Sequence, residues 1–135
     1  MKATLDHIGI AVEDLEEALA FYRDALGFNV DATEEVGSQA VRAHFLNVGS
    51  ASLELLEATS PQSPVARFIS RRGAGLHHIT LRVDDIDEAL ARLRARGVQL
   101  IDETPRDGAE GSLVAFIHPR STHGVLIELK QQRVE

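Results

Sequence analysis

Residues 6–24 read DHIGIAVEDLEEALAFYRD, and residues 77–95 read HHITLRVDDIDEALARLRA. When the first stretch is shifted by 71 positions onto the second, nine of the 19 pairs are identical, among them His7 with His78. The same shift places Phe45 over Phe116, and Glu54 corresponds to Glu128 after a hairpin that is three residues longer in the second copy. A repeat of this length that occurs only twice indicates a paired module and not a solenoid.

Each copy has the same predicted anatomy. Residues 5–12 and 76–83 alternate between apolar and polar positions and are predicted to be strands. An amphipathic helix follows each strand, beginning at Asp14 or Asp85 and ending at Gly27 or Gly97. Three more strands are expected in each copy, near residues 28–35, 40–48 and 51–57, then 98–103, 112–118 and 124–130.

The pattern predicts an α+β fold in which two tandem βαβββ modules form a curved mixed sheet around a metal-binding cleft. We expect a single domain over residues 1–135, with module 1 at about 4–60, a linker helix at about 61–74 and module 2 at about 75–131. With 44% hydrophobic residues, a chain of this length can bury a core of its own.

The amino-acid composition excludes several kinds of functional site and binding partner. The absence of cysteine excludes disulfides, cysteine-ligated metal clusters and thiol nucleophiles. A formal net charge of -7 argues against general nucleic-acid binding, although it leaves room for a local anion site. The sequence shows no signal peptide and no apolar run of transmembrane length, so we expect a cytoplasmic protein without a membrane partner.

Strand parity singles out four polar residues. Neighbouring side chains of a strand point to opposite faces, and Ile8, Ile10 and Val12 form the apolar face of the first strand, which leaves His7 on the other. The same argument separates His78, Glu54 and Glu128 from the apolar positions beside them. If a pseudo-twofold axis relates the modules, two imidazoles and two carboxylates converge on one cleft.

Such a donor set suits one divalent ion of the group Co²⁺, Mn²⁺, Ni²⁺, Fe²⁺ or Zn²⁺. The alternative is that the four are unrelated polar residues on exposed strand faces. Repetition of both residue types at matched positions favours the metal site.

The chain resembles the vicinal-oxygen-chelate (glyoxalase/bleomycin-resistance/dioxygenase) superfamily, and within it the methylmalonyl-CoA epimerase family. Three segments carry this resemblance: LDHIGIAVEDLEEALAFYRDALGF, SPVARFISRRGAGLHHITLRVDDID and FIHPRSTHGVLIEL. The resemblance implies the VOC fold, a homodimer, and His7, Glu54, His78 and Glu128 as ligands of the metal. It also implies interconversion of (R)- and (S)-methylmalonyl-CoA through an enolate, by proton transfer at C2.

One position departs from the resemblance. Several bacterial epimerases have a catalytic Glu in the strand that reads QAVRAHFL here, where this chain has Ala43. Symmetry of the two copies therefore nominates Glu54 and Glu128 as the two bases.

Alternatives remain within the superfamily. Glyoxalase I uses similar metal chemistry on a glutathione hemithioacetal, an extradiol dioxygenase has an iron site, and a bleomycin-resistance-type protein binds its ligand without a metal. An acyl-CoA substrate would need cations for its phosphates, and three clustered arginines are candidates: Arg67, Arg71 and Arg72. These three, called the arginine cluster below, could equally be a solvated helix end.

Overall fold

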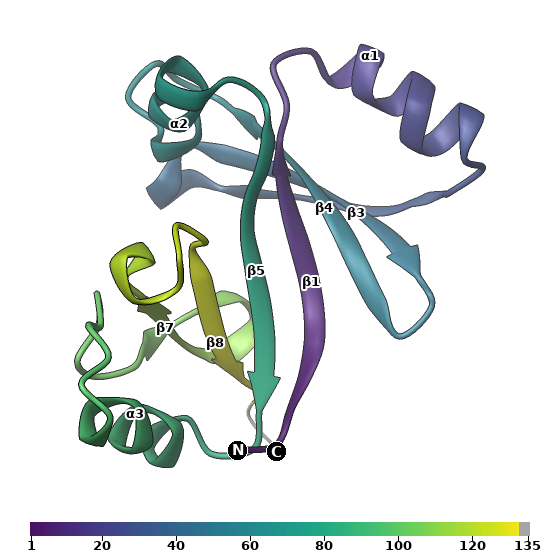
Figure 1. The fold of residues 1–135 in the computed structure, drawn as a ribbon. Coiled ribbons are helices and arrows are strands. Elements are labelled where there is room, and N and C mark those ends of the chain that lie inside the picture. Colours follow the sequence, from purple (N-terminus) through teal and green to yellow (C-terminus); the bar gives the residue numbers. More distant parts are fainter. Residues whose placement is uncertain (133–135) are drawn as a thin grey trace. The chain divides into compact units, whose positions relative to one another are not determined.

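The computed structural model describes residues 1–132 and has the predicted α+β fold, with one βαβββ module in each half of the chain (Figure 1). The first module comprises β1 (Ala3–Ala11), α1 (Leu15–Leu19), β2 (Val30–Val36), β3 (Val41–Val48) and β4 (Ala51–Ala58). The second comprises β5 (Gly75–Val83), α3 (Ile86–Ala95), β6 (Arg106–Asp107), β7 (Leu113–Ile117) and β8 (Ile127–Gln131). Between them lies α2 (Pro64–Arg72), a π-helical turn (Ala20–Ala25) continues α1, and short 3-10 turns span Gly37–Gln39, Ala109–Gly111 and Pro119–Ser121.

Internal contacts divide the chain into two compact units. The N-terminal unit is His7–His77, and the C-terminal unit combines Met1–Asp6 with the chain from His78 onward. The backbone therefore passes between the units twice, at Asp6–His7 and at His77–His78.

The strands of the N-terminal unit follow the order β2-β3-β4-β1. β1 runs parallel to β4, and the two hairpin pairs are antiparallel. Helix α1 packs on one face, where Leu19 meets Leu46 and Leu55, and helix α2 packs on the other, where Val65 meets Ala43 and Leu56. We call these the α1 face and the α2 face.

The C-terminal unit repeats this plan with the strand order β5-β8-β7-β6. β5 is parallel to β8, and helix α3 covers one face through Ile86, Ala89 and Leu90. These residues pack on Leu129 and Ala115, so both modules cover one face of their strands with the helix that follows the first strand.

The helix boundaries agree with the sequence analysis. Side chains of Asp14 and Asp85 accept hydrogen bonds from the backbone N–H three residues later, at 3.1 Å in both modules. Gly27 and Gly97 have positive φ values of 83° and 78°, which suits the glycine that follows a helix. Within the described part of the chain, no helix is long and apolar enough to span a membrane.

One expected strand is wrong. Residues 98–103 do not form a strand; Leu100 makes only an isolated bridge to Ile117, and the edge strand is β6, further along the chain. The physical reason is a side chain: the Asp102 carboxylate accepts the Phe116 N–H at 2.8 Å, where a regular strand would offer a backbone carbonyl.

Candidate metal and catalytic site

His7 and Glu54 form a buried pair in the N-terminal unit. They lie on the neighbouring strands β1 and β4, with His7 Nδ1 2.8 Å from Glu54 Oε2. Both are nearly inaccessible, at 8% and 9% exposure. Because Glu54 alternates with Leu55 and shares its side with Leu56, the pair lies on the α2 face, as parity predicted.

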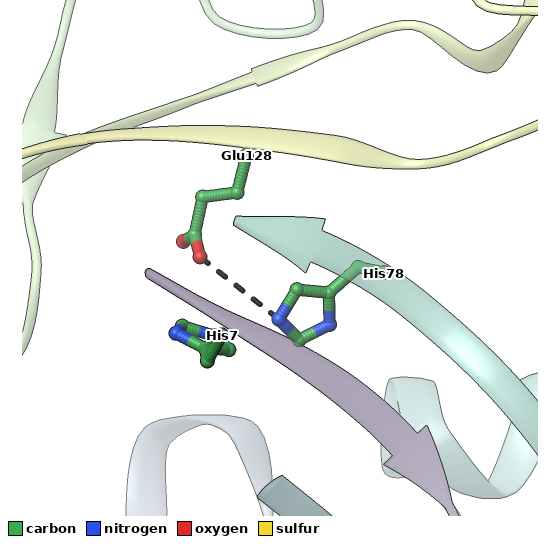
Figure 2. A group of neighbouring side chains, drawn as sticks. All are labelled: His7, His78 and Glu128. Carbon is green, nitrogen blue, oxygen red and sulfur yellow. Dashed lines mark ion pairs between the residues drawn. The ribbon is translucent and has the colours of Figure 1, made fainter. Parts of the chain in front are cut away.

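His78 and Glu128 form the corresponding pair in the C-terminal unit. His78 Nε2 lies 4.0 Å from Glu128 Oε1, the ion pair drawn in Figure 2. His78 is 8% exposed, and both side chains lie on the face of β5 and β8 that α3 leaves uncovered. Thr80, fully buried beside them, donates its hydroxyl to Glu128 Oε1 at 2.6 Å.

Strand register confirms that the two carboxylates occupy equivalent positions. Glu54 is paired with Gly9 across the parallel strands and with Phe45 across the antiparallel ones. Glu128 is paired in the same way with Thr80 and with Phe116. Gly9 and Thr80, like Phe45 and Phe116, are related by the 71-residue shift. The sequence alignment is therefore also the structural one.

The donor set fits a divalent metal ion. A buried carboxylate is costly unless a positive group compensates it. Glu54 is buried beside His7, and the half-buried Glu128 lies near His78. An ionised carboxylate only accepts hydrogen bonds, so the Nδ1 of His7 that faces Glu54 would carry the ring hydrogen. Imidazole and carboxylate donors together suit divalent metal ions.

Ala43 has no ionisable group, and in the structure its position is part of an apolar cluster. Ala43 lies on the α2 face, two strand positions from Phe45, and is 5% exposed within an apolar cluster of Ala11, Leu56 and Val65. The position at which the resemblance implied a carboxylate belongs here to the packing of α2.

The arginine cluster lies on helix α2, with its side chains exposed to solvent. The buried side of α2 packs on the α2 face through Val65, Phe68 and Ile69. The Arg72 guanidinium lies over the Phe68 ring at 6.0 Å. The cluster is thus carried by the helix that covers the face bearing His7 and Glu54.

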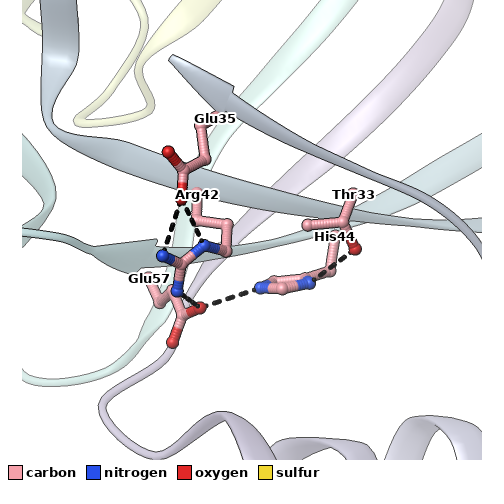
Figure 3. Close-up of polar contacts among 5 residues, drawn as sticks. All are labelled: Thr33, Glu35, Arg42, His44 and Glu57. Carbon is pink, nitrogen blue, oxygen red and sulfur yellow. Dashed lines mark hydrogen bonds and ion pairs between the residues drawn. The ribbon is translucent and has the colours of Figure 1, made fainter. Parts of the chain in front are cut away.

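A second polar group, which the sequence analysis missed, lies on the α1 face (Figure 3). The buried His44 ring contacts Thr33 Oγ1 at 3.1 Å through Nδ1 and Glu57 Oε1 at 3.0 Å through Nε2. Arg42 donates to the same Glu57 oxygen at 2.9 Å and to Glu35 at 2.7 Å. Strand alternation of Arg42 and His44 could have indicated a shared face, but their partners come from β2 and β4 and depend on register.

The charged and polar contacts of this network favour the ionised form of Glu57. Burial alone raises the pKa of Glu57, but hydrogen bonds from His44 and Arg42 outweigh it and hold that pKa below its usual range. Glu35 and Glu57 in turn raise the pKa of Arg42. The network is a set of structural ion pairs on the opposite side of the strands from His7 and Glu54.

The other histidines have structural contacts. His118 caps a 3-10 turn, because its Nδ1 accepts the Arg120 N–H at 3.0 Å. His77 packs edge-on against Phe68 of α2, with ring centroids 4.9 Å apart, and burial lowers its pKa. Neither His118 nor His77 is therefore a candidate ligand of the metal.

Comparisons with known proteins agree with this geometry. Residues 6–116 match the family model of the Glyoxalase/Bleomycin resistance protein/Dioxygenase superfamily. An uncharacterized Bacillus subtilis protein, YqjC, is 46% identical over 93% of this chain and 89% of its own length. The ethylmalonyl-CoA/methylmalonyl-CoA epimerase of Cereibacter sphaeroides is 38% identical over 97% of this chain and 99% of its own.

A solved structure extends the likeness to three dimensions. A methylmalonyl-CoA epimerase in complex with methylmalonyl-CoA and NH4+ superposes with a TM-score of 0.88, at 38% identity, over 99% of this chain and 97% of that one. Since the family model covers most of the chain, the chain belongs to the glyoxalase/bleomycin resistance protein/dioxygenase superfamily, and within it is similar to the methylmalonyl-CoA epimerases.

Proposed function

We propose that this protein is a metal-dependent epimerase that interconverts (R)- and (S)-methylmalonyl-CoA. The observation that carries the proposal is the His–Glu pair, present once in each module at register-equivalent positions. Full-length similarity to named epimerases supports the choice of substrate.

The proposed ligands of one divalent ion are His7, Glu54, His78 and Glu128. Two features support this set: the burial of both histidines, and the equivalent strand positions of the two His–Glu pairs. Co²⁺, Mn²⁺, Ni²⁺, Fe²⁺ and Zn²⁺ all suit imidazole and carboxylate donors, so we propose the class of ion and not one member.

When bound, the metal ion would act as a Lewis acid towards the thioester and carboxylate oxygens of the substrate. The protein's own residues move the proton. One of Glu54 and Glu128, as carboxylate, takes the proton from C2, and the other, as carboxylic acid, returns one to the opposite face. Each turnover exchanges their protonation states, so the reverse reaction uses the same two groups in exchanged roles. His7, Glu54 and His78 are buried, which limits the access of water to these transfers.

The arginine cluster is proposed to contact the CoA phosphates. The support is its exposure and its place on α2, the helix that packs on the face carrying His7 and Glu54. Guanidinium groups suit this role because they bind phosphate through paired hydrogen bonds. We further propose a single domain over residues 1–135 that acts as a homodimer in the cytoplasm, which light scattering and fractionation would check.

The test combines metal content with proton exchange. Metal-free protein is loaded separately with each of the five ions, and each sample is incubated with each epimer of methylmalonyl-CoA in ²H₂O. We expect one bound ion per chain, conversion of either epimer to the mixture, and deuterium at C2. Metal-loaded protein that neither exchanges nor converts methylmalonyl-CoA would refute the proposal. Turnover of a glutathione hemithioacetal in its place would reassign the protein to glyoxalase chemistry.

A further inference from the structure

We propose that Thr80 is a positioning residue for Glu128, and that it makes the two carboxylates of the duplicated pairs unequal. The catalytic part of this inference rests on the proposed function, whereas the positioning itself concerns the C-terminal unit alone.

The Thr80–Glu128 contact is a strong one. Thr80 is fully buried, at 0% exposure, and its hydroxyl donates to Glu128 Oε1 at 2.6 Å. This separation is typical of a hydroxyl that donates to an ionised carboxylate, a bond roughly twice as strong as one between neutral groups. Since Thr80 and Glu128 are register partners on neighbouring strands, the backbone holds both ends of the contact.

The first module cannot make the same bond. The register partner of Glu54 is Gly9, which corresponds to Thr80 under the 71-residue shift and has no side chain. Glu54 lies instead 2.8 Å from the Nδ1 of His7. Glu128 Oε1, bonded to Thr80, lies 4.0 Å from Nε2 of His78. One carboxylate therefore contacts its histidine directly, whereas the other accepts a hydrogen bond from a hydroxyl and lies farther from its histidine.

This difference has a consequence for proton transfer. Glu128 has its orientation set by a buried donor before substrate arrives, and preorganised groups lose less free energy on reaching the reactive geometry. Loss of the Thr80 hydroxyl should therefore impair the substrate face that Glu128 serves and spare the face that Glu54 serves. A general loss of structure would impair both faces alike.

The test uses three variants of the full chain. Thr80→Val keeps the branched shape and removes the donor, Thr80→Ser keeps the donor, and Thr80→Ala removes the donor in case the valine is not tolerated. Thr33→Val is the matched control, because it removes a threonine hydroxyl bonded to His44 on the α1 face. Circular dichroism and thermal melting establish that each variant is folded.

Two measurements separate positioning from catalysis. In crystal structures of the metal-free proteins, we expect the Glu128 carboxylate of Thr80→Val to turn from its wild-type position and to return to it in Thr80→Ser. With metal-loaded protein in ²H₂O, we expect Thr80→Val to slow deuterium exchange with retention at least tenfold for one epimer. Exchange of the other epimer should stay within twofold of wild type, Thr80→Ser should recover to within threefold, and Thr33→Val should match the wild type.

The outcomes are distinct. An unmoved Glu128 carboxylate in both donor-free variants, or an equal slowing for both epimers, would overturn the proposal. If the wild type exchanges neither epimer, the proposed function fails, and the crystal structures alone decide whether Thr80 positions Glu128.

Discussion

The replacement Glu54→Gln is the sharpest test of the duplicated site. Gln keeps an oxygen that can bind a metal, but it is neutral and cannot accept the C2 proton. Glu54 is 9% exposed and lies 2.8 Å from His7 Nδ1, and the amide oxygen can accept the same hydrogen bond. The variant therefore removes a base while disturbing its surroundings little.

The expected magnitudes follow from these contacts. A positioned general base contributes about 10²- to 10⁴-fold to rate, which is about 2.7 to 5.4 kcal/mol in activation free energy. Exchange of a charge-assisted hydrogen bond for a neutral one should lower the free energy of unfolding by about 1 kcal/mol. In urea this corresponds to a midpoint lower by about 0.5 M, so the variant remains folded under assay conditions.

The assay follows both epimers of methylmalonyl-CoA in ²H₂O after metal occupancy has been measured. We expect interconversion to fall by about 10²- to 10⁴-fold, while one epimer still exchanges its C2 proton with retention. Glu57→Gln is the matched control, since Glu57 lies on the same strand but on the α1 face. If metal-loaded Glu54→Gln interconverts the epimers at the wild-type rate, Glu54 is a ligand only, and the second base is another residue.

Three further expectations concern metal, substrate and stability. His78→Ala should lose most bound metal and activity together, and a variant that keeps one tightly bound ion by metal analysis would show that His78 is not a ligand. Charge reversal at all three positions of the arginine cluster should raise KM for the acyl-CoA at least fivefold with little change in kcat; an unchanged KM would leave the cluster as solvated surface. The hydrogen bonds that lower the pKa of Glu57 stabilise the folded state above the unfolded pKa of about 4.3, and this contribution is lost as pH falls through the lower folded pKa. Glu57→Gln should therefore be less stable than wild type by about 1 kcal/mol near neutral pH, with a difference that shrinks in acid in denaturant titrations; a difference independent of pH would contradict the cause given for the pKa shift.

Much of this fold could be predicted from local sequence. The period of a strand is two residues, so an apolar face identifies the opposite face without any knowledge of tertiary contacts. This reasoning placed His7 and Glu54 on the face that α1 does not cover. Asp14 and Asp85 were equally predictable, because an N-cap bond spans only three residues.

The errors and omissions have a common origin in non-local contacts. The expected strand at 98–103 has suitable residues, but the Asp102 side chain takes the Phe116 N–H that a strand would have bonded. The His44–Glu57 contact joins neighbouring strands at positions 13 residues apart, which no local pattern reveals. Sequence periodicity gives the face of a side chain, and not its neighbour on the next strand.

The sequence by itself determined the duplication, the two βαβββ modules, and the four polar residues at matched positions, because repetition and strand alternation are properties of the chain alone. Only the tertiary structure decided which carboxylate meets which partner. Glu54 and Glu128 are equivalent in sequence, yet one lies against a histidine and the other accepts a bond from Thr80. That difference arises where β5 and β8, 48 residues apart at the contact, come into register. The distance between Thr80 and Glu128 along the sequence does not indicate such a bond. The parallel pairing of β5 with β8 is what brings the donor and the acceptor to 2.6 Å.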